Sequence, residues 1–205
     1  MKNMRLTVCI GIMCGWLATG MLHAGTRPDH VRPVEEDGSR LWLPVIRPVE
    51  GAEVEITYKG KVSPTIAIAI AELKNAWKGD PVLLEKKKTG RGDGFAITSS
   101  EHQVRILSST ETGLLYGAYS LLRMQAAGQL TVPLSVTEQP AYDLRILNHW
   151  DNPDGTVERG YAGRSLWNWE ELPGTLSPRY EAYARANASV GINGTVLNNV
   201  NASPQ

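Results

Sequence analysis

The sequence predicts an α/β protein in two parts: a small amino-terminal α/β accessory domain over residues 40–139, and the start of a (β/α)8 barrel over residues 140–205. Two observations predict this class. Strand-like segments with alternating apolar residues are interleaved with two capped helical segments in the first part. After Pro140 the order becomes strand, long loop, helix and strand, the repeating unit of a parallel sheet. A polar stretch with two prolines, residues 25–39, precedes both parts as a linker.

Residues 1–24 are typical of a secretory signal peptide. Lys2 and Arg5 precede an uncharged apolar run from Leu6 to Leu22. The competing interpretation is an uncleaved anchor, but about 17 apolar residues lie at the lower limit for crossing a bilayer. We therefore expect export to the periplasm or the extracellular medium, with no membrane contact after cleavage.

The composition excludes several classes of protein. Cys9 and Cys14 both lie in the leader, so the exported chain has no disulfide, cysteine nucleophile or cysteine metal site. Cleavage changes the balance from 21 basic and 21 acidic residues to 19 and 21. A net charge of about −2 creates no field that attracts nucleic acid, so we expect no nucleic-acid partner.

The accessory domain opens with a strand and a helix. Ala52–Tyr58 alternates acidic and apolar residues, as a half-buried strand does. The following segment alternates isoleucine and alanine, which also suits a strand. Ser63 as a cap, Pro64 at the first helical position and Gly79 as a stop favour a helix.

Three more strands and a second helix follow. Gly90–Gly94 (GRGDG) has the glycine spacing of a phosphate-binding loop, but no helix follows it and no lysine–serine pair is present. A glycine turn between two strands is favoured instead. The second helix has Ser108 and Glu111 at capping-box spacing and ends at Gly128. The strands are expected at Pro81–Lys88, Phe95–Ser100 and Gln103–Ser109, and the core stripe of the helix comprises Leu114, Leu115, Ala118, Leu121 and Leu122.

The second part reads as one β-α-β unit. Strands are expected at Asp143–Trp150 and Ile192–Ala202, and each ends in polar side chains. Between them, Ser177 and Pro178 begin a helix that stops at Gly191. Parallel strands place their carboxyl ends at one edge, where sites gather.

A complete (β/α)8 barrel takes about 250 residues. Only 66 residues follow Gln139, so the barrel is expected to be truncated. A two-stranded parallel sheet is not expected to fold well by itself.

The loop between the first of these strands and the helix carries the chemistry. Tryptophan faces stack on sugar rings, while carboxylates, amides and arginines bind sugar hydroxyls, so a carbohydrate pocket is favoured. Two structural interpretations compete: an arginine pairs with Asp154 or Glu158 to order the loop, or Trp167 and Trp169 plug the barrel mouth. The residues that suit a sugar are Trp150, Trp167, Trp169, Asp151, Asn152, Glu158, Arg159 and Arg164.

Other chemistries are weakly supported. His149 and Asp151 share a face, but no further histidine lies nearby, so no metal is expected. Ser165 lies in no nucleophile elbow. Three glycosylation triplets, at Asn187, Asn193 and Asn201, are interpreted as coincidental.

Two segments carry a family resemblance. RILNHWDNPDGTVERGYAGRSLW (Arg145–Trp167) and YARANASVGINGTVLNNVNA (Tyr183–Ala202) closely resemble the start of the catalytic barrel of the α-glucuronidases of glycoside hydrolase family 67. The preceding domain is similar to that family's amino-terminal domain, so the resemblance covers about residues 40–205. TGLLYGAYSLLR (Thr112–Arg123) is also similar to a helix in the domains that precede β-hexosaminidase barrels.

The resemblance implies an inverting enzyme without a cofactor. Family members remove α-1,2-linked glucuronic acid, or its 4-O-methyl form, from xylo-oligosaccharides during xylan breakdown. Inversion needs a general acid and a general base on opposite faces of the sugar. In the family both come from later barrel strands, so we expect them beyond residue 205 and name no catalytic residue here. The expected partners are glucuronic-acid-substituted xylo-oligosaccharides, and the complete protein is expected to form a homodimer.

The resemblance also assigns residues to one side of the uronate pocket. Glu158 and Arg159 are expected to contact hydroxyls or the carboxylate, with Trp167 as a wall. Asp151 and Asn152 are expected to shape the loop or touch the substrate, and two asparagines at the end of the second strand, Asn199 and Asn201, to reach the same pocket. Pro153 departs from the family pattern. Two alternatives remain open: a non-catalytic carbohydrate-binding or accessory module, and a β-hexosaminidase-type enzyme, against which the ERGYAGRSLW loop argues.

Overall fold

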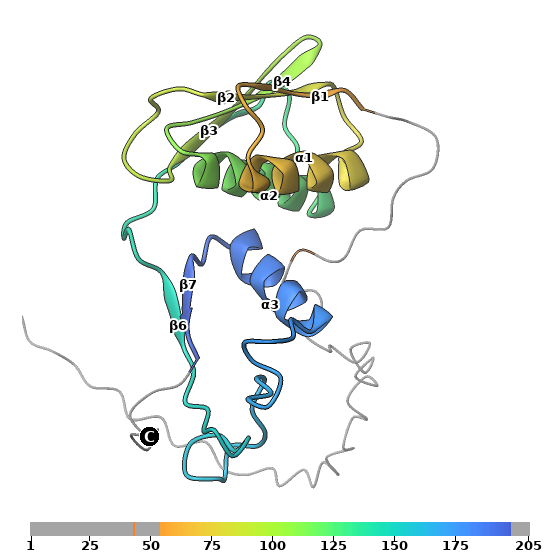
Figure 1. The fold of residues 1–205 in the computed structure, drawn as a ribbon. Helices are drawn as coiled ribbons and strands as arrows, with labels where there is room; N and C mark the ends of the chain where they lie inside the picture. Colours follow the sequence, from red (N-terminus) through yellow and green to blue (C-terminus); the bar gives the residue numbers. More distant parts are fainter. Residues whose placement is uncertain (1–42, 44–53, 198–205) are drawn as a thin grey trace, which may run out of the picture. The chain divides into compact units, whose positions relative to one another are not determined.

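The computed structural model describes residue 43 and residues 54–197; the predicted leader and linker, and also Asn199 and Asn201, lie outside this range. Within it the chain is mixed α/β (Figure 1). None of the helices in this range is both long and apolar enough to cross a bilayer. The elements are β1 (Ile56–Lys59), α1 (Pro64–Ala76), β2 (Val82–Lys86), β3 (Phe95–Ser100), β4 (Gln103–Ser108), α2 (Glu111–Ala126), β5 (Ser135–Glu138), β6 (Ile146–Asn148), α3 (Pro178–Ser189) and β7 (Gly194–Val196).

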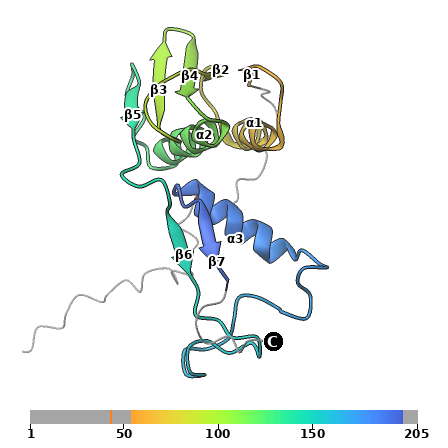
Figure 2. The same cartoon turned by 60° about the vertical axis from the view of Figure 1, so that its left-hand side comes forward.

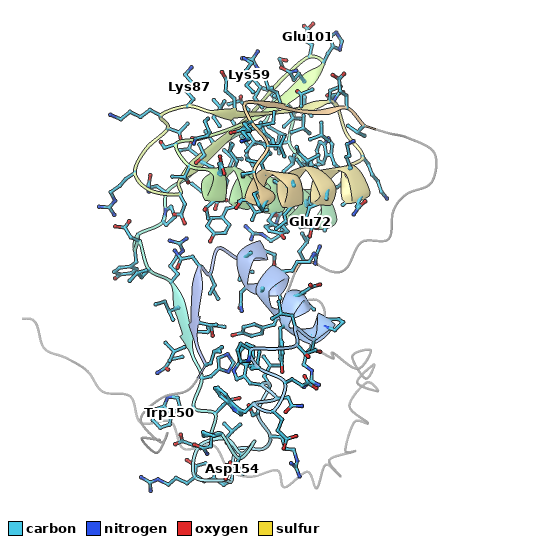
Figure 3. The ribbon with its side chains drawn as sticks, in the orientation of Figure 1. Lys59, Glu72, Lys87, Glu101, Trp150 and Asp154 are labelled. Carbon is cyan, nitrogen blue, oxygen red and sulfur yellow. The ribbon has the colours of Figure 1, made fainter. Side chains whose placement is uncertain are left out.

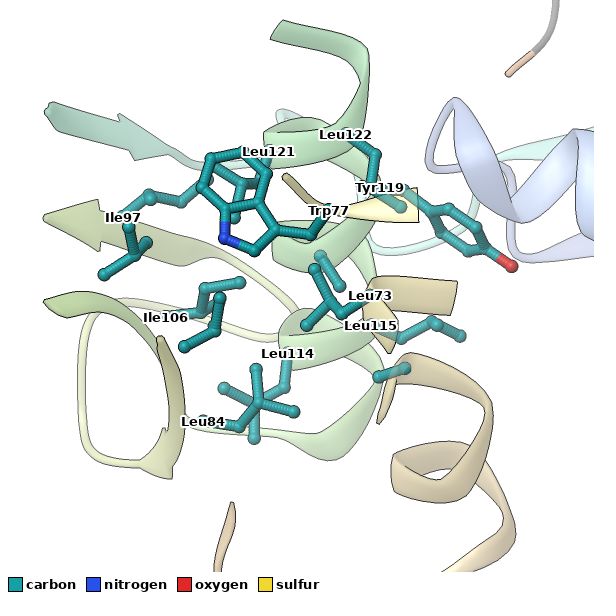
Figure 4. Close-up of a cluster of buried hydrophobic side chains, with 14 of the residues drawn as sticks. Leu73, Trp77, Leu84, Ile97, Ile106, Leu114, Leu115, Tyr119, Leu121 and Leu122 are labelled. Atoms are coloured by element: carbon teal, nitrogen blue, oxygen red, sulfur yellow. The ribbon is translucent and has the colours of Figure 1, made fainter. Parts of the chain in front are cut away.

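The first five strands form one mixed sheet in the order β1-β2-β4-β3-β5. β1, β2 and β4 run parallel, while β3 is antiparallel to both β4 and β5. Helices α1 and α2 lie side by side on one face of this sheet, as the two views show (Figure 2). The resulting core contains the predicted leucine stripe of α2, which is buried against α1 and the sheet (Figure 4).

Residues 64–76 form helix α1, as the capping residues predict, and not the strand that the alternating isoleucines and alanines also allow. The Ser63 hydroxyl accepts a hydrogen bond from the Ile66 amide at 3.3 Å, and Pro64 occupies the first turn. The helix ends at Ala76 rather than at Gly79, because Trp77 leaves helical geometry and buries its ring. Gly79 then lies directly beneath that ring, where a Cβ would overlap it.

Helix α2 begins at a different cap from the one predicted. Thr110, not Ser108, accepts the bond from the Gly113 amide, at 3.0 Å. Ser108 is the last residue of β4, and its buried hydroxyl donates to the Gly94 carbonyl at 2.7 Å. The Glu111 carboxylate accepts instead from the Ser63 hydroxyl, joining the amino-terminal ends of the two helices.

Two further features of this domain differ from the predictions. The GRGDG segment does connect β2 to β3, but these strands are not neighbours because β4 lies between them. The tight hairpin is instead the β3–β4 connection at Glu101 and His102. Strand β5 was not predicted, since Ser135–Glu138 is a mostly exposed edge strand with little apolar alternation.

The remaining elements form the predicted β-α-β unit. β6 and β7 pair in parallel, with Ile146 opposite Gly194 and Asn148 opposite Val196. Helix α3 has Ser177 as its cap and stops before Gly191, whose φ is +79°. Both strands are shorter than predicted. One β-α-β unit is present in the described residues, and its extension to an eight-stranded barrel stays a prediction.

Helix α3 is tied to the accessory domain by arginine contacts. Arg185 binds Glu72 with two nitrogens, Nε to Oε1 at 2.6 Å and Nη2 to Oε2 at 2.8 Å. The hydrogen bond that Arg185 donates to the Glu72 carboxylate raises the pKa of the Arg185 guanidinium. Arg145, just before β6, donates through one nitrogen, Nη2, to Asp93 Oδ2 of the accessory domain at 2.5 Å. These charge-assisted bonds join segments far apart in the sequence.

Candidate functional site

The segment from His149 to Trp169 leaves the carboxyl end of β6 and folds back on itself (Figure 3, with Trp150 and Asp154 labelled). Two isolated antiparallel bridges close it, Asp151 with Val157 and Thr156 with Arg164. The Glu158 amide donates to the Trp150 carbonyl at 2.8 Å. The loop is therefore a short, cross-braced hairpin rather than an irregular excursion.

Asp151 lies inside this hairpin and shapes it. Only 4% of its side chain is exposed. One carboxylate oxygen, Oδ2, accepts from the Ser165 hydroxyl at 2.5 Å and from the Leu166 amide at 3.1 Å. The other, Oδ1, lies 3.5 Å from Nδ1 of His149. Of the two roles predicted for Asp151, the geometry matches the shaping of the loop.

Glu158 has the least relaxed environment in the hairpin. Its φ is +59°, the left-handed region, and no other non-glycine residue in the described ranges has a positive φ. One carboxylate oxygen, Oε1, accepts from the Tyr161 hydroxyl at 3.0 Å, a bond that raises the pKa of Tyr161. The other, Oε2, is buried without a hydrogen-bond partner among the described residues. A conformation and a desolvated oxygen of this kind are costly, and such costs are concentrated at functional sites.

Asn152 lies against Glu158 and shares this feature. Its Nδ2 donates to the Glu158 carbonyl at 2.7 Å and to the Thr156 hydroxyl at 2.9 Å. Its Oδ1 is also buried with no partner in the part of the chain that the structure describes. Glu158 and Asn152 thus each provide one unused hydrogen-bond acceptor on the same loop.

The arginines of the loop do not form the ion pairs considered from the sequence. Arg159 and Arg164 are exposed, and neither pairs with an acidic side chain of residues 54–197. Asp154 instead accepts from the side chain and the amide of Thr156, and these bonds lower the pKa of its carboxyl group. The guanidinium of Arg159, next to Glu158 in the sequence, is thus available to an anion.

Trp167 is 6% exposed and forms the centre of an aromatic cluster. Its ring centroid lies 5.2 Å from those of Tyr180 and Tyr183 and 5.4 Å from that of His149. It also lines a mainly apolar groove of about 480 Å³ along α3 and β7, which Glu158 does not line. Trp150, by contrast, is 46% exposed. The structure therefore separates the polar acceptors of the loop from the apolar groove.

The structure brings the side chains of His149 and Tyr183 together, a contact that the sequence did not predict. Nε2 of His149 lies 2.5 Å from the Tyr183 hydroxyl, which comes from α3 and is 34 residues away in the chain. The only available signal was the histidine two residues before Asp151. Within residues 54–197 no group of three or more His, Cys, Asp or Glu side chains is placed to hold a metal ion.

Residues 124–205 match the sequence profile of the glycosyl hydrolase family 67 middle domain. The resemblance to family 67 is confirmed. Curated relatives include probable alpha-glucuronidase A of Aspergillus clavatus (43% identical), that of Neosartorya fischeri (46%) and alpha-glucuronidase A of Aspergillus tubingensis (41%). Each match covers 54% of this chain but spans only 13% of the relative's length.

The solved structures include an enzyme of family GH138 that targets pectin rhamnogalacturonan II. The similarity has a TM-score of 0.51 at 16% identity, over 70% of this chain and 18% of that one. At this level of identity the likeness concerns the fold alone.

Proposed function

We propose that this family 67 chain is part of an exported α-glucuronidase that removes α-1,2-linked glucuronic acid, or its 4-O-methyl form, from xylo-oligosaccharides. Curated relatives named alpha-glucuronidase A, 41–46% identical over the matched segment, support this activity. The proposal includes a (β/α)8 barrel begun by β6, α3 and β7, and an inverting mechanism. The family resemblance implies that its acid and base come from later strands of the barrel.

The observation that carries the role of this segment is the strained, half-satisfied Glu158. Its Oε2 and the Oδ1 of Asn152, neither of which has a hydrogen-bond partner among the described residues, are acceptors, and sugar hydroxyls are donors. The exposed guanidinium of Arg159 suits the uronate carboxylate, to which arginine can donate two parallel hydrogen bonds. Two acceptors on the loop and an exposed arginine next to Glu158 in the sequence suit a sugar that carries both hydroxyls and an acid group.

The test is hydrolysis of aldotriouronic acid by the complete protein, measured as released glucuronic acid. Loss of an interaction with the bound sugar in the Glu158→Ala variant should lower kcat/KM by at least tenfold, about 1.4 kcal/mol. Glu170→Ala is a matched control, because Glu170 is exposed on the same segment and its side chain makes no hydrogen bond or ion pair with a described residue. A Glu158→Ala enzyme within about twofold of wild type would show that Glu158 is structural.

A non-catalytic carbohydrate-binding module is the second candidate. It is favoured by two aromatic rings exposed on the loop, Trp150 at 46% and Tyr161 at 73%, since such rings can stack on sugars. Saturable quenching of tryptophan fluorescence by aldouronic acids, without any release of glucuronic acid by the complete protein, would support this candidate over the enzyme.

A further inference from the structure

We propose that His149 is a positioning residue for the Glu158 loop: its ring joins the Tyr183 hydroxyl on α3 to the Asp151 carboxylate inside the hairpin. This inference rests on the proposed function and adds to it a residue that does not touch the sugar. It explains how a loop with one strained residue is held in a single conformation.

The position of His149 is fixed from three sides. Its backbone amide donates to the Val196 carbonyl at 2.9 Å, which ties it to β7. Its ring packs edge-on against Trp167 and Tyr183, each with centroids 5.4 Å apart. The Tyr183 hydroxyl, 2.5 Å from Nε2, also lies 3.4 Å from the Thr195 hydroxyl. Since α3 and β7 are regular elements, the imidazole has little freedom to rotate.

The other ring nitrogen faces the loop. Nδ1 lies 3.5 Å from Asp151 Oδ1, whose carboxylate is almost fully buried. A buried carboxylate needs donors, and Oδ2 already has the Ser165 hydroxyl and the Leu166 amide. In the tautomer that carries its proton on Nδ1, this nitrogen can donate to Oδ1, and Nε2 can accept from the Tyr183 hydroxyl. In this tautomer each ring nitrogen faces a polar partner.

Backbone contacts couple the position of Asp151 to that of Glu158. Asp151 is bridged to Val157, the residue before Glu158. The Glu158 amide donates to the carbonyl of Trp150, which lies between His149 and Asp151. A shift of the Asp151 carboxylate therefore moves both strands of the hairpin and with them the Glu158 side chain.

The inference is tested with kinetic variants of the complete protein. His149→Phe keeps an aromatic ring but removes both nitrogens, and we expect KM for aldotriouronic acid to rise about tenfold, with kcat within about threefold, because uniform sugar binding is lost. His149→Gln, which can donate and accept, should recover most of that loss. Tyr183→Phe removes only the hydroxyl and should raise KM in the same direction. His102→Phe, at the exposed β3–β4 turn, is the matched control.

The outcomes separate the two proposals. An inactive wild-type protein overturns the proposed function and this inference with it. An active wild type whose His149→Phe and Tyr183→Phe variants keep KM within twofold overturns the inference alone. If His149→Phe does not fold, Tyr183→Phe and His149→Gln decide: a KM within twofold of wild type for Tyr183→Phe, or a rise in KM of tenfold or more for His149→Gln, contradicts the positioning role.

Discussion

Replacing Glu158 with glycine should stabilise the fold and weaken sugar binding at the same time. In the left-handed region, at φ +59°, a side chain costs about 1–2 kcal/mol, which glycine avoids. Removing the buried, unpaired Oε2 relieves about 1–3 kcal/mol more. Against this, the added freedom of glycine in the unfolded chain costs about 0.5–1 kcal/mol. Loss of the bond from Tyr161 offsets less, because this bond lies at the surface and water can replace it.

The net expectation is that the free energy of unfolding rises by roughly 1–2 kcal/mol. The assay is urea unfolding followed by tryptophan fluorescence, paired with titration by aldotriouronic acid. The affinity for this sugar should fall at least tenfold.

A control in the same loop measures the strain alone. Gly160 has φ +92° and open space around a would-be Cβ, so Gly160→Ala adds only backbone strain. It should destabilise by about 1–2 kcal/mol. If Glu158→Gly instead lowers the free energy of unfolding by more than about 1 kcal/mol, the contacts of Glu158 hold the loop together and the argument from strain is wrong.

Three further predictions concern the frame around the site. Gly117→Ala should destabilise the fold by roughly 1–2 kcal/mol, because the new methyl group overlaps a β4 side chain, although alanine is the better helix former. Ala71→Gly, at an exposed position of α1, measures the effect of helix propensity alone. A higher Tm for Gly117→Ala would contradict the predicted overlap. Thr110→Ala should lower the free energy of unfolding, measured by thermal unfolding, by about 1 kcal/mol, because Thr110 caps α2. An unchanged stability would show that another residue caps this helix. A double-mutant cycle of Glu72→Gln and Arg185→Gln should give a coupling energy of about 1–3 kcal/mol, and additive effects would show that this partly buried ion pair contributes nothing.

The local parts of the fold followed from the sequence. Ser63 with Pro64, and Ser177 with Pro178, begin helices where predicted, because a cap and its first turn are set by residues two or three positions apart. The leucine stripe of α2 is buried for the same reason, since helical periodicity alone decides which side chains share a face.

The features that depend on pairing between distant segments could not be predicted from the sequence. Ser108 was a plausible cap until β4 extended to it and Gly94 took its hydroxyl. β5 has no apolar alternation, and it is a strand because β3 offers it an open edge. Such choices depend on which segments meet, and the sequence of either segment does not contain that information.

For the site, the sequence by itself determined which chemistry is available and where in the chain it lies. The loop after β6 carries acids, amides, arginines and tryptophans, and the family resemblance rests on the same residues. Only the tertiary structure decided which of these side chains shape the loop and which leave a hydrogen-bonding atom for a ligand. Asp151 is turned inward, Glu158 is held in the left-handed region with an unpaired oxygen, and Trp167 is packed among tyrosines of α3. Residue types fix what a side chain can bind, whereas burial and the partners brought in by α3 and β7 decide which atoms remain unused for a ligand.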